Sequence, residues 1–310
     1  MRNFISEDDI EQAILQKLEG DPFQYGILRC DPSPDKRELL PDGTGRSSKK
    51  ECVLPLILRE ALARLNPDIP GEKLEEIARD LCRDFSATDM TATNYKYYNQ
   101  IRNGIKISLR RNGKEDFDFV KLVDFDRPEN NTFTAVSQMW IQGRVYWRRP
   151  DVLIFINGLP MVFVELKNSI VKVEEAYNDN LKNYLRDIPN LFAFNQICVL
   201  SNGLETRLGA FNATYNHFFE WLKVNSEKER PDRQALKEAG TVGESSVRYF
   251  IDGLLRKDRL VDYIENFIMF RNQKNKIIAK NHQYFGVNNL MESVKNRAEL
   301  QGKLGVFWHT

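Results

Sequence analysis

The chain has 310 residues, 42% of them hydrophobic and 29% charged, and its 45 basic and 44 acidic residues leave a formal net charge of +1. This length is enough for two hydrophobic cores, and the near-neutral charge excludes a uniformly basic protein but not a local basic cleft. No apolar stretch approaches the roughly 20 residues that span a bilayer, the N-terminus lacks a secretory signal, and the scattered cysteines indicate free thiols. We therefore expect a soluble cytoplasmic protein with no membrane partner.

The first third of the chain has mainly helical periodicity. Ser6 and Asp9 form a weak capping box before apolar residues at helical spacing, which predicts a helix over 7–19. Residues 29–50 are rich in Pro, Gly, Ser and charge, and indicate a long exposed loop. From 51 to about 108 the apolar stripes again favour helices, with a break at Asn66-Pro67.

The apolar period then changes from 3.6 to 2, which predicts successive strands. The Asn157-Gly158 pair lies between two of them and is the strongest short hairpin signal in the sequence. A helix is expected at about 174–186. The predicted strands cover residues 117–124, 133–138, 145–147, 151–156, 161–167 and 196–201.

The segment 226–246 is polar and suggests a boundary, after which residues 254–264 and 277–294 have helical spacing. The last residues, from Gly305 to Thr310, have the character of a buried strand that stops in mid-element. We therefore expect the natural protein to continue beyond Thr310.

The strongest candidate for a catalytic motif is Pro150-Asp151, followed after thirteen residues by Glu165-Leu166-Lys167. Glu165 and Lys167 are two apart on a predicted strand, so both leave the same face. Because that strand is apolar on both faces, a buried carboxylate and ammonium need partners. A hairpin that folds Asp151 beside Glu165 supplies two close carboxylates, which a Mg²⁺ ion can bridge. The metal lowers the pKa of a bound water, while the lysine orients that water or stabilises developing charge.

The hairpin imposes a geometric condition. A strict two-residue loop at Asn157-Gly158 pairs Asp151 with Val164 and puts Asp151 and Glu165 on opposite faces. A shared metal therefore requires a three-residue loop or a bulge at Gly158. On spacing alone the pattern is weak, since Glu165 and Lys167 also fit a salt bridge at the end of a strand.

The run "RRPDVLIFINGLPMVFVELKN", within residues 120–169, closely resembles the N-terminal nuclease domain of the R subunits of type I restriction enzymes. The match continues through 176–203 and into the C-terminal "KIIAKNHQYF" and "GVFWHT". The resemblance implies an α/β fold with a PD-(D/E)xK restriction-endonuclease-like core, in which helices flank a central mixed sheet. It also implies an N-terminal helical region and the beginning of a helicase-like motor domain. By this resemblance Asp151 and Glu165 are the metal-binding carboxylates and Lys167 is the catalytic lysine.

The implied domains are an endonuclease domain over 1–228, with a helical insertion at about 51–108, and a second unit over 229–310. The second unit contains a linker and the first elements of a superfamily 2 motor. His282-Gln283 resembles the adenine-reading motif of such motors, so Gln283 is the predicted adenine contact. No GxxxxGK[ST] loop occurs in the chain, so ATP binding and ATPase activity are expected only of the full-length protein.

Several accessory residues carry two interpretations. The family's Gln-x-x-x-Tyr motif matches Asn180 and Tyr184. Asn is one methylene shorter than the family's Gln, so its contact to metal, substrate or lysine can differ. Tyr184 also fits a core tyrosine that packs a helix on the sheet. Glu11 resembles an upstream helical acid that some relatives add to the metal site, although a solvated residue fits as well. Arg148 and Arg149 fit phosphate contacts or an internal ion pair with Asp124 or Asp126.

The resemblance favours a Mg²⁺-dependent endonuclease that cuts unmodified double-stranded DNA after ATP-driven translocation by the full-length enzyme. Modification and specificity subunits are the implied partners, and S-adenosylmethionine enters only through the modification subunits. One alternative is a catalytically silent scaffold that docks the motor on the modification core. A nucleotide-binding α/β domain is disfavoured, because no Gly-rich turn from strand to helix has the required spacing.

Overall fold

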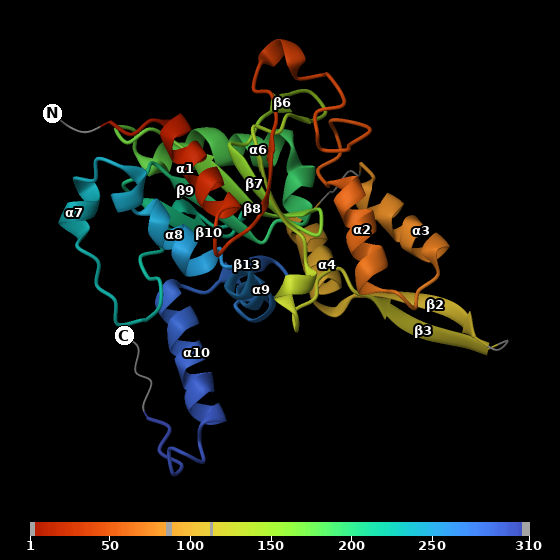
Figure 1. Ribbon diagram of the computed structural model, residues 1–310. Coiled ribbons are helices and arrows are strands. Elements are labelled where there is room, and N and C mark those ends of the chain that lie inside the picture. Colours follow the sequence, from red (N-terminus) through yellow and green to blue (C-terminus); the bar gives the residue numbers. More distant parts are fainter. Residues whose placement is uncertain (1–3, 85–88, 112–113, 306–310) are drawn as a thin grey trace.

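A seven-stranded mixed sheet forms the centre of the molecule (Figure 1). The computed structural model describes residues 4–84, 89–111 and 114–305. The sheet contains, in spatial order, β1 (Gly26–Arg29), β4 (Phe133–Ser137), β7 (Val152–Ile156), β8 (Leu159–Leu166), β9 (Ile197–Ser201), β10 (Thr206–Gly209) and β11 (Phe219–Glu220). The pairs β1/β4 and β8/β9 are parallel and the other pairs antiparallel. The sheet is therefore mixed, as expected.

Three two-stranded sheets lie outside the central one: β2 (Ile105–Arg111) with β3 (Lys114–Val120), β5 (Ile141–Gln142) with β6 (Trp147–Arg148), and β12 (Ile268–Arg271) with β13 (Asn275–Ile278). The prediction that helix extends to about 108 is wrong. Gly104, at φ 81°, ends the preceding helix, and the chain then pairs as a ribbon. The strands β1, β12 and β13 were also not predicted, because four-residue segments show too little periodicity.

Several helices lie where the apolar stripes predicted them, but the helices at 233–237 and 247–254 lie outside the predicted segments, and residues 277–278 belong to β13. The first helix spans the predicted 7–19, and its capping box is present, since the Ser6 hydroxyl accepts from the Asp9 backbone N–H at 3.1 Å. The α-helices are α1 (Glu7–Glu19), α2 (Pro55–Leu65), α3 (Gly71–Cys82), α4 (Met90–Asn103), α5 (Val173–Glu175), α6 (Lys182–Asp187), α7 (Arg233–Lys237), α8 (Val247–Leu254), α9 (Lys257–Asn266) and α10 (Asn281–Lys295). A π-helical segment, η3 (Ala176–Leu181), joins α5 to α6, and short 3₁₀ turns are η1 (Pro34–Lys36), η2 (Pro128–Asn130), η4 (Pro189–Ala193), η5 (Tyr215–His217) and η6 (Val242–Glu244). No helix among the described residues is long and apolar enough to span a membrane.

Two hydrophobic clusters cover the two faces of the sheet. Alternate residues of β7, such as Leu153 and Ile154, belong to different clusters, as expected for a strand buried on both sides. One cluster includes α1 and α8, and the other includes η3 and α6. Every residue of β7 and β8 is buried. The two strands that carry the predicted site are therefore fully buried, as are β4 and β9.

The segment 29–50 is irregular, as predicted, but not wholly exposed. Arg46 and Lys49 are buried, and each places a nitrogen 2.7 Å from the same Asp42 carboxylate oxygen. The prediction of an exposed loop fails here because the two basic side chains are paired with a carboxylate inside the loop.

The C-terminal part shares a core with the sheet. The first cluster runs from Ile5 to Phe285 and includes α8 and α9. Lys276 of β13 is buried and donates to the Asn195 carbonyl at 2.6 Å and to the Gln196 side chain at 2.8 Å. The division at 228/229 stays a prediction, but α8, α9 and β13 share a core with the sheet.

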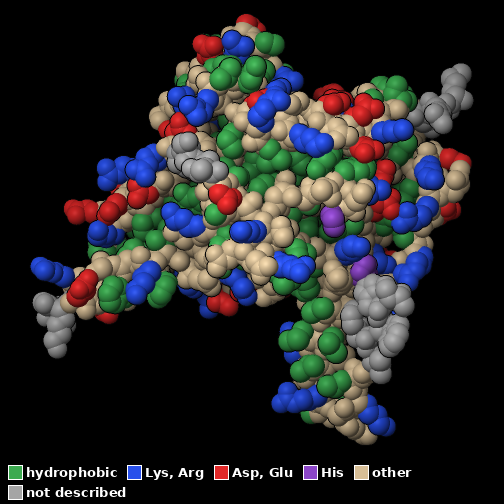
Figure 2. All heavy atoms as spheres, turned by 180° about the vertical axis from the view of Figure 1, so that it is seen from behind, with side chains coloured by type: hydrophobic (Ala, Val, Ile, Leu, Met, Phe, Trp, Pro, Cys, Tyr) green, Lys and Arg blue, Asp and Glu red, His purple; other side chains and the backbone are tan. Residues whose placement is uncertain are grey.

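The last helix, α10, projects from the body (Figure 1). It presents hydrophobic side chains to solvent, as Figure 2 shows, among them Val287, Leu290 and Met291. The predicted strand after Gly305 lies outside the described residues.

Candidate active site

The hairpin between β7 and β8 sets the geometry of the candidate site. Asn157 and Gly158 form a two-residue turn between the paired residues Ile156 and Leu159. Their φ angles are 52° and 81°, the left-handed values that a type I′ turn requires. A Cβ on Gly158 would lie 2.6 Å from the Leu54 carbonyl oxygen, so only glycine fits.

A β-bulge restores the alignment that this turn would otherwise prevent. Ile154 pairs with Val162 and Phe155 with Pro160, so Met161 is the extra residue. The predicted position of the bulge, at Gly158, is therefore wrong, because the turn itself is a strict two-residue turn. The predicted consequence holds, since beyond the bulge Val152 pairs with Val164. The next residues, Asp151 and Glu165, stand opposite each other and face the same side.

Asp151 and Glu165 are held by neighbouring donors. Asp151 Oδ2 accepts the Leu166 backbone N–H at 2.7 Å, and Glu165 Oε1 accepts the side-chain amide of Asn180. Glu165 Oε2 is buried and has no hydrogen-bond partner. Burial raises the pKa of Asp151 to about 6, and burial together with the Asp151 charge raises the pKa of Glu165 well above its usual range.

Lys167 lies beside the two carboxylates. Its Nζ is 3.7 Å from Glu165 Oε1 and 3.9 Å from Glu7 Oε1 on α1. The expected pairing of the lysine with a site carboxylate is therefore present. Glu165 itself is nearly inaccessible to solvent, since its side chain is 2% exposed against 17% for Lys167.

Glu11 and Gln138 extend the site toward α1. Glu11 is 6% exposed, so it is not the solvated surface residue that the sequence also allowed. Gln138 follows β4 directly, and its side-chain amide donates to Glu11 Oε2 and lies 3.5 Å from Asp151 Oδ1. Gln138 was not among the predicted site residues, and its place at the end of a predicted strand was the only available signal.

Asn180 and Tyr184 both face this site, from η3 and α6. Asn180 bonds Glu165 despite its shorter side chain, in a π-helical segment of a kind often found at functional sites. The Tyr184 hydroxyl donates to the Arg149 carbonyl at 3.0 Å, and its ring packs edge-on against Phe163. Tyr184 therefore packs in the core and also lies beside Glu165, and burial, with the nearby Glu165 charge, raises its pKa well above the usual range.

The two arginines before Asp151 have internal partners. Arg148 donates through Nε to Asp187 at 2.8 Å, so an ion pair exists, but the predicted partners, Asp124 and Asp126, are wrong. Asp124 instead accepts from the Arg127 backbone N–H and the Asn130 amide within its own loop. Arg149 donates to the Pro32 carbonyl at 2.5 Å and lies over the Trp140 ring.

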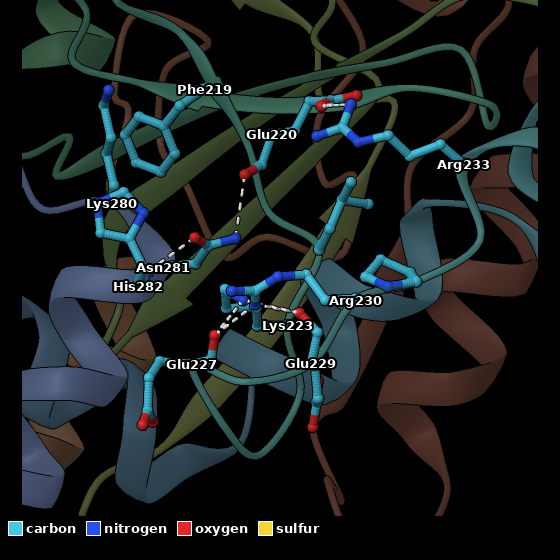
Figure 3. Close-up of a pocket in the computed structure, with 12 residues that line it drawn as sticks. Phe219, Glu220, Lys223, Glu227, Glu229, Arg230, Arg233, Lys280, Asn281 and His282 are labelled. Atoms are coloured by element: carbon cyan, nitrogen blue, oxygen red, sulfur yellow. Dashed lines mark hydrogen bonds and ion pairs between the residues drawn. The ribbon is translucent and has the colours of Figure 1, made fainter. Parts of the chain in front are cut away.

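Gln283 lies far along the chain, at the start of α10. Its Oε1 accepts the Lys280 backbone N–H at 2.8 Å, which caps the helix. Lys280, Asn281 and His282 line a cavity of about 580 Å³ opposite the 219–233 segment (Figure 3). The adenine-reading role of Gln283 stays a prediction.

The donor set around Asp151 fits a hard divalent cation. Mg²⁺ is usually held by one or two carboxylates, with water and substrate oxygens completing the shell. Asp151, Glu165 and the unpartnered Glu165 Oε2 supply such oxygens. No group of three or more His, Cys, Asp or Glu side chains within the described ranges forms a metal-binding cluster.

Comparison with known proteins places the chain in a family. Residues 4–217 match the family described as "Type I restriction enzyme R protein N terminus". The chain is 32% identical to the Type I restriction enzyme HindI endonuclease subunit of Haemophilus influenzae over 99% of its own length and 28% of the relative's. It is 28% identical to the Putative type I restriction enzyme MjaIXP endonuclease subunit of Methanocaldococcus jannaschii, over 97% of its length and 29% of the relative's. The chain thus spans less than a third of these relatives, and it belongs to the type I restriction enzyme R protein N-terminal family.

Proposed function

We propose that this chain is the Mg²⁺-dependent endonuclease domain of a type I restriction enzyme, with a PD-(D/E)xK core. The observation that carries the proposal is the bulged hairpin, which brings Asp151 opposite Glu165 with Lys167 beside them. The names of the relatives, endonuclease subunits of type I restriction enzymes, support it. Double-stranded DNA is the proposed substrate.

Each site residue has a proposed role in phosphodiester hydrolysis. A bound Mg²⁺ supplies Lewis-acid stabilisation of the phosphate and a water of lowered pKa. Asp151 and Glu165 hold that ion, and Asn180 fixes the Glu165 carboxylate by donating to Oε1. Lys167, whose ammonium lies at the exposed edge of the pair, orients the attacking water or stabilises charge on the phosphate oxygens. Tyr184 anchors the backbone just before Asp151 through the Arg149 carbonyl.

The remaining functions belong to the longer protein and its assembly. ATP-driven translocation by a helicase-like motor, recognition by specificity subunits and S-adenosylmethionine use by modification subunits are proposed for the complete enzyme. Gln283 is the proposed adenine contact there. The present chain is expected to hydrolyse no ATP by itself, because its sequence has no phosphate loop.

Cleavage of supercoiled plasmid DNA by the assembled enzyme tests the proposal. With ATP, Mg²⁺ and an unmodified target, relaxed and linear products should form, and Asp151→Asn or Glu165→Gln should abolish them. ATP hydrolysis should survive both changes, because it belongs to the motor. Normal cleavage by either variant would refute the assignment and would favour a catalytically silent scaffold.

A further inference from the structure

Gln138 has an unusual backbone conformation beside the candidate site. It follows the last residue of β4 with φ at 57°, a left-handed value that costs free energy for any residue except glycine and is tolerated best by Asn and Asp. Its backbone N–H donates to the Asp151 carbonyl at 3.0 Å. The backbone therefore turns at the point where it brings the Gln138 side chain beside Asp151.

The Gln138 side chain joins two carboxylates from different elements. Its Nε2 donates to Glu11 Oε2 on α1 and lies 3.5 Å from Asp151 Oδ1, at the start of β7. Carboxylates accept hydrogen bonds and donate none when ionised. The amide nitrogen is thus the group of Gln138 that fits between them.

The orientation of the amide leaves its oxygen without a donor. Gln138 Oε1 is buried and unpartnered, and so is Glu165 Oε2. Buried oxygens of this kind are ordinarily satisfied by a donor, a water or a cation. Gln138 and Glu165 therefore each leave one buried oxygen available to such a partner.

We infer that Gln138 is a positioning residue that ties Glu11 to Asp151 and so fixes the Asp151 carboxylate, which with Glu165 would hold one divalent cation. This inference rests on the proposed function and adds Gln138 to its site. Gln138 holds the Glu11 carboxylate against the sheet, where Glu11 is nearly inaccessible to solvent. Without the amide, Glu11 and Asp151 have no donor between them and repel each other. Removal of Gln138 therefore weakens metal binding by displacing carboxylates rather than by removing one.

Metal titration of matched variants tests the inference. Gln138→Asn shortens the side chain by one methylene, so the amide no longer reaches Glu11. Because Asn tolerates a positive φ, the change adds no backbone strain, and any effect comes from the lost contact. Calorimetric Mn²⁺ titration without DNA should show binding weakened about 10–100-fold, the range found for residues that orient metal ligands. Gln273→Asn is the control, because Gln273 is exposed and has nearly the same φ, 58°. Unchanged Mn²⁺ affinity in Gln138→Asn would overturn the inference.

A double-variant cycle distinguishes positioning from a purely structural role. If Gln138 acts through Glu11, the two losses should not add. The double variant Glu11→Gln/Gln138→Asn should then have the same Mn²⁺ affinity as whichever single variant binds Mn²⁺ less tightly. Fully additive losses would show independent roles and overturn the inference. The same cycle measured by urea unfolding in EDTA should also be non-additive, since the contact exists without metal.

Mn²⁺ titration of Asp151→Asn distinguishes failure of the Gln138 role from failure of the proposed metal site. Loss of Mn²⁺ binding in that variant, with Gln138→Asn unaffected, would overturn the role of Gln138 alone. Unchanged binding in Asp151→Asn would overturn the metal site itself, and with it the proposed function.

Discussion

The substitution Asp151→Asn tests whether the buried carboxylates destabilise the metal-free protein. Burial raises the pKa of Asp151 from its ordinary value of 3.8 to about 6. The folded chain therefore binds this proton more tightly than the unfolded chain does. The resulting stabilisation is fully present below about pH 4 and is lost as the pH rises through about 6.

The size of the effect follows from the pKa difference. A rise of about two pKa units, at about 1.4 kcal/mol each, makes the ionised carboxylate cost the fold about 3 kcal/mol at pH 8. Asn avoids that cost but weakens the hydrogen bond from the Leu166 backbone N–H, an offset of about 1 kcal/mol. In EDTA at pH 8, Asp151→Asn should therefore be more stable than the unchanged chain by about 2 kcal/mol.

Urea denaturation in EDTA measures this difference. At about pH 4 the variant should have no advantage, because the unchanged chain is then protonated at Asp151. Adding Mg²⁺ at pH 8 should stabilise the unchanged chain and not the variant. Asp126→Asn, at an exposed position, serves as the control and should show neither effect. A variant that is less stable than the unchanged chain at both pH values would refute the reasoning.

Three further predictions concern single side chains. Lys167→Ala should lower plasmid cleavage by the assembled enzyme about 10²–10⁴-fold while the chain stays folded, and normal cleavage would contradict its role. Arg148→Ala leaves the buried Asp187 paired only with Arg186, an exposed residue, so the free energy of unfolding should fall by about 1–3 kcal/mol. If DNA affinity fell instead and stability did not, Arg148 would be a phosphate contact. Tyr184→Phe keeps the ring packing and removes the donor to the Arg149 carbonyl. The free energy of unfolding, measured with urea, should therefore fall by about 1 kcal/mol. An unchanged free energy of unfolding would show that this hydrogen bond contributes nothing.

The fold was predictable where the apolar pattern is long. The helix at 7–19 and the strands around 133–137, 152–156 and 197–201 were visible because each buries a regular set of side chains. The strand β2 was missed because its alternation of Ile105, Ile107 and Leu109 follows a helix directly, with only Gly104 between them. The partner of Arg148 was also missed, because Asp187 comes from a helix 39 residues away and nothing local indicates their contact.

The candidate site was predictable only in part, for a similar reason. Asp151, Glu165 and Lys167 lie within one hairpin, so spacing along the chain describes their arrangement. Gln138 reaches Asp151 from another strand, and Glu11 comes from a helix 127 residues from Gln138 in sequence. Such contacts depend on the packing of α1 against the sheet, which no short motif encodes.

The bulge at Met161 has a consequence for how this hairpin tolerates changes in length. Deleting that one residue would remove the bulge and leave the other pairs unchanged, so Asp151 would still stand opposite Glu165. Deleting a different residue of β8 while the bulge is kept would instead shift the register by one and turn Glu165 and Lys167 to the far face of the sheet. A one-residue change in the length of this hairpin should therefore keep a shared cation site only when the bulge is lost or gained with it.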